Sequence, residues 1–280
     1  MNKWQVLARQ SLSFDRAILG SSIPAVLKWR FLSQKARALP ILLIGHPTIL
    51  DLGVLQFHVS DISSLGTFQS CIVDVHDELI TSGSLVRTAE PLVVDVGANV
   101  GQFAMAVKLL CPGSNVMSFE PDPATFSLLQ ENISHLPNVR AHCVALGSST
   151  TRLPLYRHEL SVMSSLVGGG RDPEGVINGV IDVDVARLDD VLPAGEMIDI
   201  LKIDVEGFEL EVLKGSIESL RRTRYLLLEL GLGRQDDGRN LEVLSLVKSL
   251  APDSRIIRFG RPLGGTAQPA CQDVLISLQR

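Results

Sequence analysis

The fold is decided by the stretch Val94-Asp95-Val96-Gly97-Ala98-Asn99-Val100-Gly101, in which an apolar run ends and a helical one begins. The run Leu92–Val96 has the continuous apolar character of a strand that is buried on both faces. Residues Val100–Leu110 then follow helical spacing until Cys111-Pro112-Gly113 ends it. A glycine turn between a buried strand and a helix is where an open α/β sheet binds its ligand. The stretch therefore predicts both an architecture and a ligand site.

Strand and helix patterns alternate on the carboxyl side of this stretch. Such alternation predicts parallel strands joined by right-handed crossovers, with helices on both faces of one sheet. The expected strands are Asn115–Phe119, Val139–Ala145, Ile198–Ile203, Tyr225–Leu230, Arg255–Phe259 and Val274–Leu278; the expected helices are Pro123–His135, Phe208–Gly215 and Leu241–Ser249. The last two strands are separated by a loop, which predicts an antiparallel hairpin at one edge of the sheet.

Two regions lie outside this alternation. Residues 150–187 form an insertion, in which Leu153–Tyr156 and Val180–Val185 are expected to pair as extra strands. Residues 1–88 form a helical and mixed extension, so the binding domain is expected to cover residues 89–280. In the extension, two helices are predicted around Gly20-Ser21-Ser22. The expected short strands are Ile41–Ile44, Gly53–Val59 and Ser70–Val75, followed by a turn or short helix at His76–Ser82.

Composition excludes several classes of protein. The chain has 280 residues, 45% of them hydrophobic, which excludes a disordered chain. Its net charge of −5 argues against a general nucleic-acid binder. The four cysteines lack the spacing of a zinc site and the density of a disulfide scaffold, as expected for thiols in a reducing compartment. Neither a secretory signal nor a stretch long enough to span a membrane is recognised, so we expect a cytoplasmic protein.

The first 40 residues are basic, with seven Lys and Arg against one Asp, a net charge of +6. They also contain Trp4, Phe14, Trp29 and Phe31. One interpretation is a pair of helices that pack on the main domain and expose basic faces. Others are a lid over a large, partly apolar or acidic acceptor, contact with a membrane surface, or a homodimer contact.

The glycine loop differs from that of dinucleotide-binding proteins. Their fingerprint requires further glycines where this chain has Asn99 and Gln102–Phe103. Asp95 places a carboxylate at the strand end, which suits a ligand with a cationic amino group better than a pyrophosphate. S-Adenosylmethionine has such a group, together with a ribose and no phosphate. Glu120, at the end of the second strand, is expected to accept hydrogen bonds from both ribose hydroxyls.

Three ordered blocks resemble the signature of one enzyme family. They are Val94–Gly101, Phe119-Glu120-Pro121-Asp122 and Leu201-Lys202-Ile203-Asp204-Val205-Glu206-Gly207-Phe208-Glu209, and they are similar to those of the FkbM family of S-adenosylmethionine-dependent methyltransferases. The resemblance covers about residues 90–232. It implies the class I methyltransferase fold, a Rossmann-like, mostly parallel sheet. It also implies O-methylation of a sugar, polyketide or other secondary-metabolite hydroxyl by a small-molecule enzyme.

The expected cofactor site collects residues from four strand ends. Gly97 and Gly101 are expected to allow a close backbone approach, and Asn99 to contact the methionine portion or cap the helix. The adenine is expected near Ala145-Leu146-Gly147, and Ser164–Ser165 is a further place for hydrogen bonds. The whole predicted set is Asp95, Gly97, Asn99, Gly101, Glu120, Pro121, Ala145 and Asp204.

Methyl transfer to a hydroxyl requires a group that removes a proton. Asp204 is the first choice for this base, with Lys202 paired to it and Glu206 supporting the loop. The alternative is that these three residues form a structural ion network. Asp204 and Glu206 also suit a divalent metal, but two carboxylates are too few to predict one.

Histidines provide rival bases. His158 lies in the insertion and His76 just before the main domain, whereas His135 and His142 are expected to be structural. Glu229, at the end of the fifth strand, is a candidate for acceptor binding. Two alternatives to the methyltransferase remain: a second class of enzyme, a nicotinamide-dependent oxidoreductase, and an adaptor or scaffold that binds the cofactor without catalysis.

Overall fold

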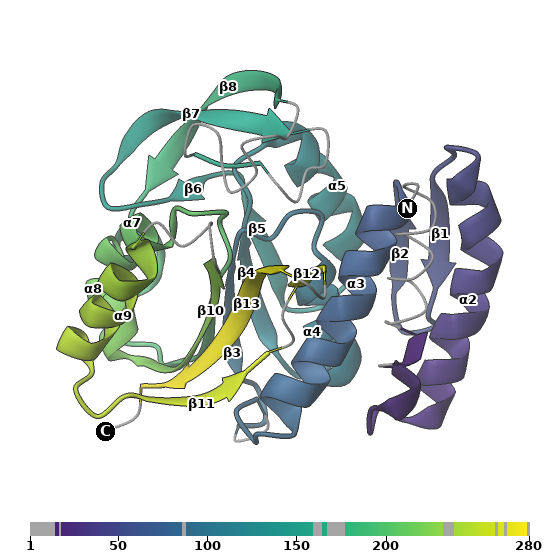
Figure 1. The fold of residues 1–280 in the computed structure, drawn as a ribbon, viewed down its shortest axis with the longest axis horizontal. Helices are drawn as coiled ribbons and strands as arrows, with labels where there is room; N and C mark the ends of the chain where they lie inside the picture. Colours follow the sequence, from purple (N-terminus) through teal and green to yellow (C-terminus); the bar gives the residue numbers. More distant parts are fainter. Residues whose placement is uncertain are drawn as a thin grey trace.

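The central sheet of the computed structural model is mostly parallel, as expected (Figure 1). The structure describes residues 15–16, 18–85, 88–158, 164–166, 177–231, 238–260, 263–265 and 268–278, of which 158, 263–265 and 268–271 by their backbone alone. The strands lie in the order β11-β13-β10-β9-β3-β4-β5, and β12 pairs with β13. Their bounds are β3 Leu92–Val96, β4 Asn115–Phe119, β5 Val139–His142, β9 Ile198–Ile203, β10 Thr223–Gly231, β11 Arg255–Phe259, β12 Leu263–Gly265 and β13 Gln268–Ser277.

The middle strands of this sheet are buried because helices cover both faces. All of β3 and β9 is buried, and Asp95 and Lys202, adjacent in register, are the charged residues within them besides Asp199. The helices of the main domain are α4 Gln102–Leu110, α5 Pro123–Ile133, α6 Leu188–Val191, α7 Glu209–Lys214, α8 Ile217–Arg221 and α9 Arg239–Leu250. Strand β13 runs antiparallel to both β10 and β11, which confirms the expected edge hairpin.

Successive residues of each strand contribute to two separate cores. Val93 and Ile200 pack towards α4 and α5, whereas Val94 and Leu201 pack towards α6, α7, α8 and α9. This alternation follows from the two-residue period of a strand, which turns neighbouring side chains to opposite faces. The polar side chains of Asp95 and Lys202 belong to the first face, the one that also receives the N-terminal extension.

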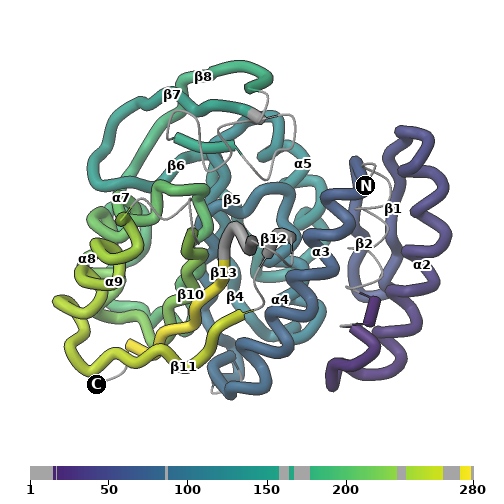
Figure 2. The backbone as a smooth tube through the Cα atoms, viewed as in Figure 1, coloured from purple at the N-terminus to yellow at the C-terminus, as the bar shows by residue number. Residues whose placement is uncertain are grey.

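The N-terminal extension packs against α4 and shares its core. It consists of α2 Ala25–Leu43, the hairpin β1 Thr48–Asp51 and β2 Gln56–Val59, α3 Ile62–Asp74 and the π-helix η1 Val75–Ile80. Phe31, Phe57 and Phe68 join the same hydrophobic cluster as Val93 and Met105. In the backbone view this layer lies at the right, with α2 outermost (Figure 2).

Two strands predicted in the extension are helical. Ile41–Ile44 belongs mainly to the end of α2, and Ser70–Val75 belongs mainly to α3. Short apolar runs do not distinguish a strand from a buried helix segment, and this caused both errors. The start of α3 does carry a helical signal, because the Asp61 side chain accepts a hydrogen bond from the Ser64 N–H at 2.8 Å. The second expected N-terminal helix is α2, and the first falls mostly outside the described residues.

The insertion forms a small sheet of its own. Strands β7 Thr151–His158 and β8 Ile177–Ala186 pair antiparallel, as predicted, and β6 Ala145–Leu146 pairs with β8. The single strand expected over Val139–Ala145 is therefore wrong: β5 ends at His142 and β6 joins the second sheet. This break turns the backbone at Ala145 away from the central sheet and towards the insertion.

Candidate functional site

The loop after β3 is joined by backbone hydrogen bonds to the ends of both neighbouring strands. The N–H groups of Gly97 and Ala98 donate to Phe119 O at 3.1 and 3.0 Å, and Asp204 N–H donates to Val96 O at 3.1 Å. Gly97 has φ +81°, and a Cβ there would lie 1.8 Å from Asp204 O. Glycine is therefore required at 97 by a positive φ and by a close approach of the protein's own backbone.

Glu120 is held in place by the same loop. Its Oε2 accepts a hydrogen bond from Asn99 N–H at 3.0 Å, and its Oε1 accepts one from Asp122 N–H at 2.9 Å. Burial raises the pKa of Glu120 to about 7, although the hydrogen bonds from Asp122 and Asn99 oppose this rise. Each carboxylate oxygen retains a second lone pair, so Glu120 can still accept hydrogen bonds from a ligand.

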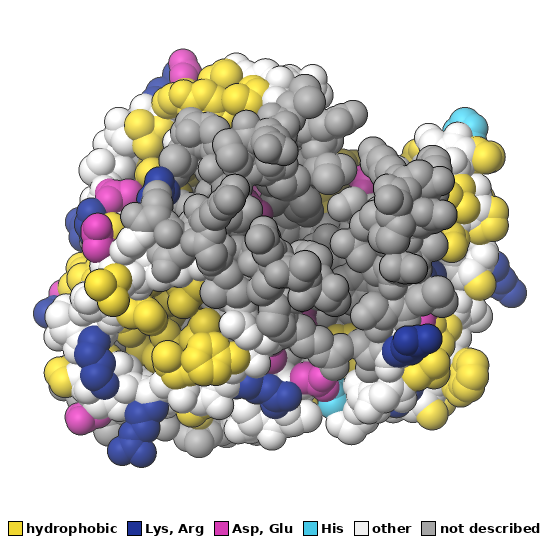
Figure 3. Space-filling view, in the orientation of Figure 1, with side chains coloured by type: hydrophobic (Ala, Val, Ile, Leu, Met, Phe, Trp, Pro, Cys, Tyr) yellow, Lys and Arg dark blue, Asp and Glu magenta, His cyan; other side chains and the backbone are white. Residues whose placement is uncertain are grey.

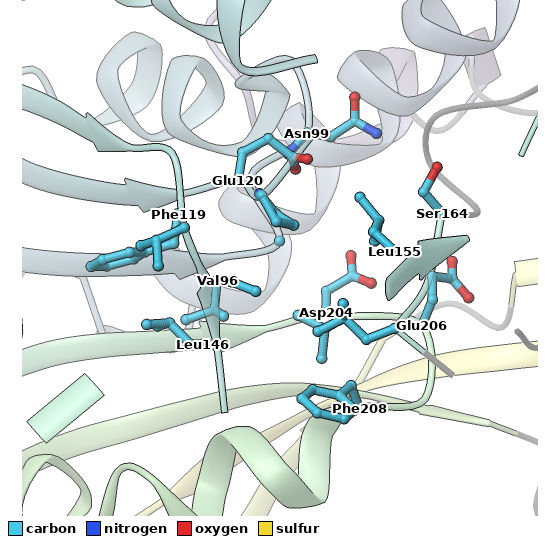
Figure 4. Close-up of a pocket in the computed structure, with 16 residues that line it drawn as sticks. Val96, Asn99, Phe119, Glu120, Leu146, Leu155, Ser164, Asp204, Glu206 and Phe208 are labelled. Atoms are coloured by element: carbon cyan, nitrogen blue, oxygen red, sulfur yellow. The ribbon is translucent and has the colours of Figure 1, made fainter. Parts of the chain in front are cut away.

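A pocket opens between these strand ends, and Glu120 and Asp204 point into it from opposite sides (Figure 4). Its wall is polar where the central strands end and apolar where the insertion and α7 approach. The lining residues are Val96, Gly97, Asn99, Phe119, Glu120, Pro121, Val144, Ala145, Leu146, Leu155, Ser164, Leu166, Asp204, Val205, Glu206 and Phe208. A polar end beside an apolar slot suits a ligand with a hydroxylated part and a flat aromatic part.

Most of the predicted cofactor residues line this pocket. Gly97, Asn99, Glu120, Pro121, Ala145 and Asp204 all do, whereas Asp95 and Gly101 do not. Gly101 has φ +92° before α4, and a Cβ there would lie 2.8 Å from Leu129 Cδ1. The need for glycine at position 101 is therefore explained by the packing of α4 against α5, and not by the expected close approach of the backbone to a ligand.

Asp95 lies behind the pocket and faces Lys202. Lys202 Nζ is 3.4 Å from Asp95 Oδ1 and 3.3 Å from Asp204 Oδ2, and it lies 5.4 Å from the centre of the Phe103 ring. Burial lowers the pKa of Lys202, but Asp204 and Asp95 outweigh it and hold the pKa above its ordinary value. Burial raises the pKa of Asp95, and Lys202 counteracts that rise. The ammonium group thus connects the buried acid to the acid that lines the pocket.

Three carboxylates meet beside Lys202. One ligand oxygen from each of Asp204, Glu206 and Glu229 lies within 4.8 Å of the other two. Glu229 is 6% exposed and comes from β10, next to β9 in the sheet. Glu206 adopts a left-handed backbone with φ +51°, unusual for a residue other than glycine. The sequence pattern predicted Asp204 and Glu206 together, and the sheet adds Glu229 to them.

The insertion closes one side of the pocket. Ser165 Oγ donates to Glu206 O at 2.8 Å, and Ser165 also pairs with Tyr156 of β7 through two backbone hydrogen bonds. On the other side, Arg157 Nε lies 2.7 Å from Asp122 Oδ2, whose side chain is buried. The insertion is therefore attached to both the Glu120 loop and the Glu206 loop.

The histidine alternatives differ in how far the structure describes them. His76 is buried outside the pocket lining, where Nε2 contacts Ser22 Oγ and Nδ1 contacts Asp77 Oδ1, both at 2.9 Å. The contacts of His76 therefore lie within the N-terminal extension, and His76 does not line the pocket. His158 ends β7, but its side chain lies outside the described residues. His142 stacks on Phe119, with ring centres 5.1 Å apart.

The sequence placed the adenine near Ala145-Leu146-Gly147, but it did not single out the rest of the apolar wall. Leu146, Leu155, Leu166 and Phe208 line the pocket from four separate segments. Leu155 carried a weak signal, because it lies on a strand that was predicted in the insertion. Leu166 and Phe208 became neighbours of these residues only in the folded chain.

Comparison with known proteins identifies the family of the chain. The profile of the "Methyltransferase FkbM domain" matches residues 95–251, more than half of the chain. The protein belongs to the FkbM methyltransferase family. Its strand order and the loop between β3 and α4 accordingly define a class I methyltransferase fold.

Individual relatives match the chain only in part. It is 37% identical over 157 residues to "Methyltransferase sdnD" of Sordaria araneosa, covering 45% of this chain and 61% of that protein. It is 30% identical over 168 residues to "2-O-methyltransferase NoeI" of Sinorhizobium fredii, covering 55% and 68%. Among solved structures, the N-terminal domain of human METTL16 in complex with SAH has a TM-score of 0.45 at 12% identity, covering 76% and 71%.

Proposed function

We propose that this protein transfers a methyl group from S-adenosylmethionine to a hydroxyl of a small molecule. The observation that carries the proposal is the pocket in which Glu120 and Asp204 face each other across the loop at Gly97. Membership of a methyltransferase family supports the reaction class. The 2-O-methyltransferase named among the relatives favours oxygen as the methylated atom.

The residues present fit the cofactor. Glu120 has acceptor capacity for the ribose hydroxyls, and Gly97 and Asn99 of the neighbouring loop line the same pocket. Leu146 and Phe208 offer apolar surface for the adenine, next to Ala145. We propose that Asp95 serves the site through Lys202, because its own carboxylate is fully buried behind the pocket.

Asp204 is the proposed base, with Lys202 as its partner. When bound, S-adenosylmethionine supplies the methyl group in activated form, so the protein must orient the acceptor and take its proton. Asp204 is partly exposed and lines the pocket, so an acceptor hydroxyl can reach it. Lys202 Nζ lies 3.3 Å from Asp204 Oδ2 and is proposed to hold this carboxylate in position at the pocket wall. Glu206 and Glu229 are proposed to hydrogen-bond other hydroxyls of the acceptor.

The proposal also covers the class of acceptor, the walls of its binding site and the compartment in which the protein works. A sugar, a polyketide or another secondary metabolite is the expected substrate class, and residues 1–88 and the insertion are proposed to build its walls. Among the described residues, no helix has the length and apolar character needed to cross a bilayer. Cys71, Cys111 and Cys143 are free thiols, which supports a reducing compartment such as the cytoplasm.

The test combines cofactor binding with turnover. S-Adenosylhomocysteine binding is measured by calorimetry, and methyl transfer from labelled S-adenosylmethionine is measured on a panel of glycosides and polyketide alcohols. We expect Asp204→Asn to lower kcat at least about 100-fold while cofactor affinity changes less than about threefold. Asp184→Asn, at an exposed residue paired with Arg152, is the matched control and should retain full activity.

Two outcomes would contradict the proposal in different ways. A folded parent that does not bind S-adenosylhomocysteine would overturn the assigned cofactor. A parent that binds it tightly but methylates nothing on the panel would favour the second candidate, a cofactor-binding adaptor without catalysis. Full activity in Asp204→Asn would leave the reaction standing and remove Asp204 as the base.

A further inference from the structure

Helix α2 has apolar residues on two opposite faces, and only one of them is covered. Phe31, Ala38 and Leu42 are 2%, 3% and 6% exposed and pack into the core. On the other side Val26 is 75% exposed and Trp29 67% exposed. An apolar patch that remains exposed on a folded protein often marks a site of contact with another surface. The outer face of α2 therefore has the composition of a contact surface.

The exposed apolar residues form a stripe at helical spacing that one polar residue interrupts. Val26, Trp29, Ala36 and Pro40 share one side of α2, with Ser33 as the polar member, and Ile44 continues the line at 72% exposure. At 1.5 Å per residue the stripe is about 27 Å long. Apolar and basic side chains mark this edge in the space-filling view, where α2 lies at the right (Figure 3).

Basic side chains accompany the stripe. Arg30 and Arg37 are exposed on α2, one helical turn after Val26 and one after Ser33 respectively. Arg30 forms a salt bridge with Asp51, in which Nη2 lies 3.7 Å from Oδ1. Both side chains remain about half exposed. Residues 1–40 carry a net charge of +6, so the other 240 residues carry −11. Along the sequence the charge is therefore unevenly distributed, and Arg30 and Arg37 place part of the positive charge beside the apolar stripe.

We propose that the outer face of α2 is a docking surface for an anionic lipid membrane, with the helix lying in the plane of the interface. The apolar stripe buries itself at the boundary of the headgroups, and Trp29 has the amphipathic ring that this boundary favours. Arg30 and Arg37 reach the lipid phosphates with their long side chains. Repulsion between the acidic remainder and the anionic surface then orients the molecule.

A second copy of the chain fits this face less well than a membrane does. A two-fold contact through α2 would bring the Arg30 and Arg37 side chains of both copies to one interface, where like charges repel. An anionic membrane attracts the same arginines. The proposal is independent of the methyl transfer, because the stripe shares no residue with the pocket lining.

The experiment measures co-sedimentation of the full chain with vesicles. Vesicles of phosphatidylcholine with 30% phosphatidylglycerol (roughly the charge density that polybasic segments sense) are compared with pure phosphatidylcholine. The parent should partition at least about tenfold more strongly to the anionic vesicles. Trp29→Ser/Ile44→Ser should lose at least about tenfold in partitioning, and Arg30→Gln/Arg37→Gln should lose the preference for phosphatidylglycerol.

The matched control removes equally exposed apolar residues elsewhere. Leu241 and Phe259 are 74% and 60% exposed on α9 and β11, so Leu241→Ser/Phe259→Ser should bind vesicles like the parent. All variants are checked for an unchanged circular dichroism spectrum and melting temperature. The proposal is overturned if the folded parent does not bind anionic vesicles. It is also overturned if Leu241→Ser/Phe259→Ser lowers partitioning to the vesicles as much as Trp29→Ser/Ile44→Ser does. A concentration-dependent dimer that Trp29→Ser/Ile44→Ser abolishes would instead assign the face to a second copy.

Discussion

Lys202 Nζ lies 3.4 Å from Asp95 Oδ1, and both residues are buried in the middle of the sheet. They come from adjacent parallel strands, β9 and β3, and their Cα atoms are partners in register. Lys202 also reaches Asp204 at the pocket wall. The pair therefore supports the site from behind, and removing one member leaves an uncompensated charge in the core.

Lys202→Met is expected to destabilise the protein by about 3–5 kcal/mol, because two buried or half-buried carboxylates lose their counter-charge. Urea denaturation measures the change. Lys214→Met is the matched control, since Lys214 pairs with Glu211 at 2.6 Å on the surface and should cost about 0.5 kcal/mol or less. Adding Asp95→Asn to Lys202→Met should recover part of the loss. An equal loss of unfolding free energy in Lys202→Met and Lys214→Met would show that the buried ion pair stabilises the protein no more than the surface pair does.

Cofactor binding is expected to release a proton from Glu120. The pKa of Glu120 is raised to about 7 by burial, so at pH 6.5 roughly three quarters of the free protein carries the proton. Ribose hydroxyls that donate to Glu120 favour the ionised form, so affinity for S-adenosylhomocysteine should rise with pH up to about 7 and then level off. Calorimetry in buffers of different ionisation enthalpy should detect about 0.75 proton released at pH 6.5 and about 0.1 at pH 8. Equal release at both pH values would contradict this.

Stability should depend on pH through the same residue. Because the pKa of Glu120 is higher in the folded protein than its ordinary value, its contribution is complete below about pH 4.5 and is lost as the pH rises through 7. A shift of this size corresponds to about 3 kcal/mol. Denaturation of the parent at pH 6 and pH 8, compared with Glu120→Ala, isolates the effect. A variant with the same pH dependence as the parent would assign the dependence to other groups.

Gly97→Ala is expected to abolish cofactor binding and to destabilise the fold by more than about 4 kcal/mol. The added methyl would lie 1.8 Å from Asp204 O, and the backbone at 97 has φ +81°. Gly195→Ala is the matched control, with φ +91° and open space around the added atom. It should cost only the backbone strain, about 1–2 kcal/mol. Thermal unfolding of both variants separates the steric clash from that strain.

Removal of divalent metals is expected to leave methyl transfer unchanged. Asp204, Glu206 and Glu229 have the geometry of a carboxylate metal site, but Lys202 already places a cation 3.3 Å from Asp204. Turnover is compared before and after treatment with EDTA, followed by addition of Mg²⁺ or Mn²⁺. A loss that either metal restores would overturn this prediction and assign the three carboxylates to a metal.

Local signals in the sequence were strongest in the main domain. The apolar runs at Asn115–Phe119, Ile198–Ile203 and Arg255–Phe259 became β4, β9 and β11 with the same bounds. Burial on both faces imposes a continuous apolar pattern on β9, whereas β11 is a largely exposed edge strand whose run was marked by the turn residues that flank it. In the extension, the apolar run Ser70–Val75 led to the prediction of a strand, although most of it belongs to α3. Helix α3 is buried by contacts with α4, and these contacts leave no signal in the local sequence.

Chain order alone was enough to predict the alternating α/β sheet, the glycine loop and the acids at the strand ends, because each depends on neighbouring residues. Tertiary structure decided what those acids contact. It turned Asp95 towards Lys202, brought Glu229 beside Asp204 and closed the pocket with Leu155 and Phe208. The reason is physical: parallel strands bring together residues that are far apart along the chain, and strand register selects which side chains share a face.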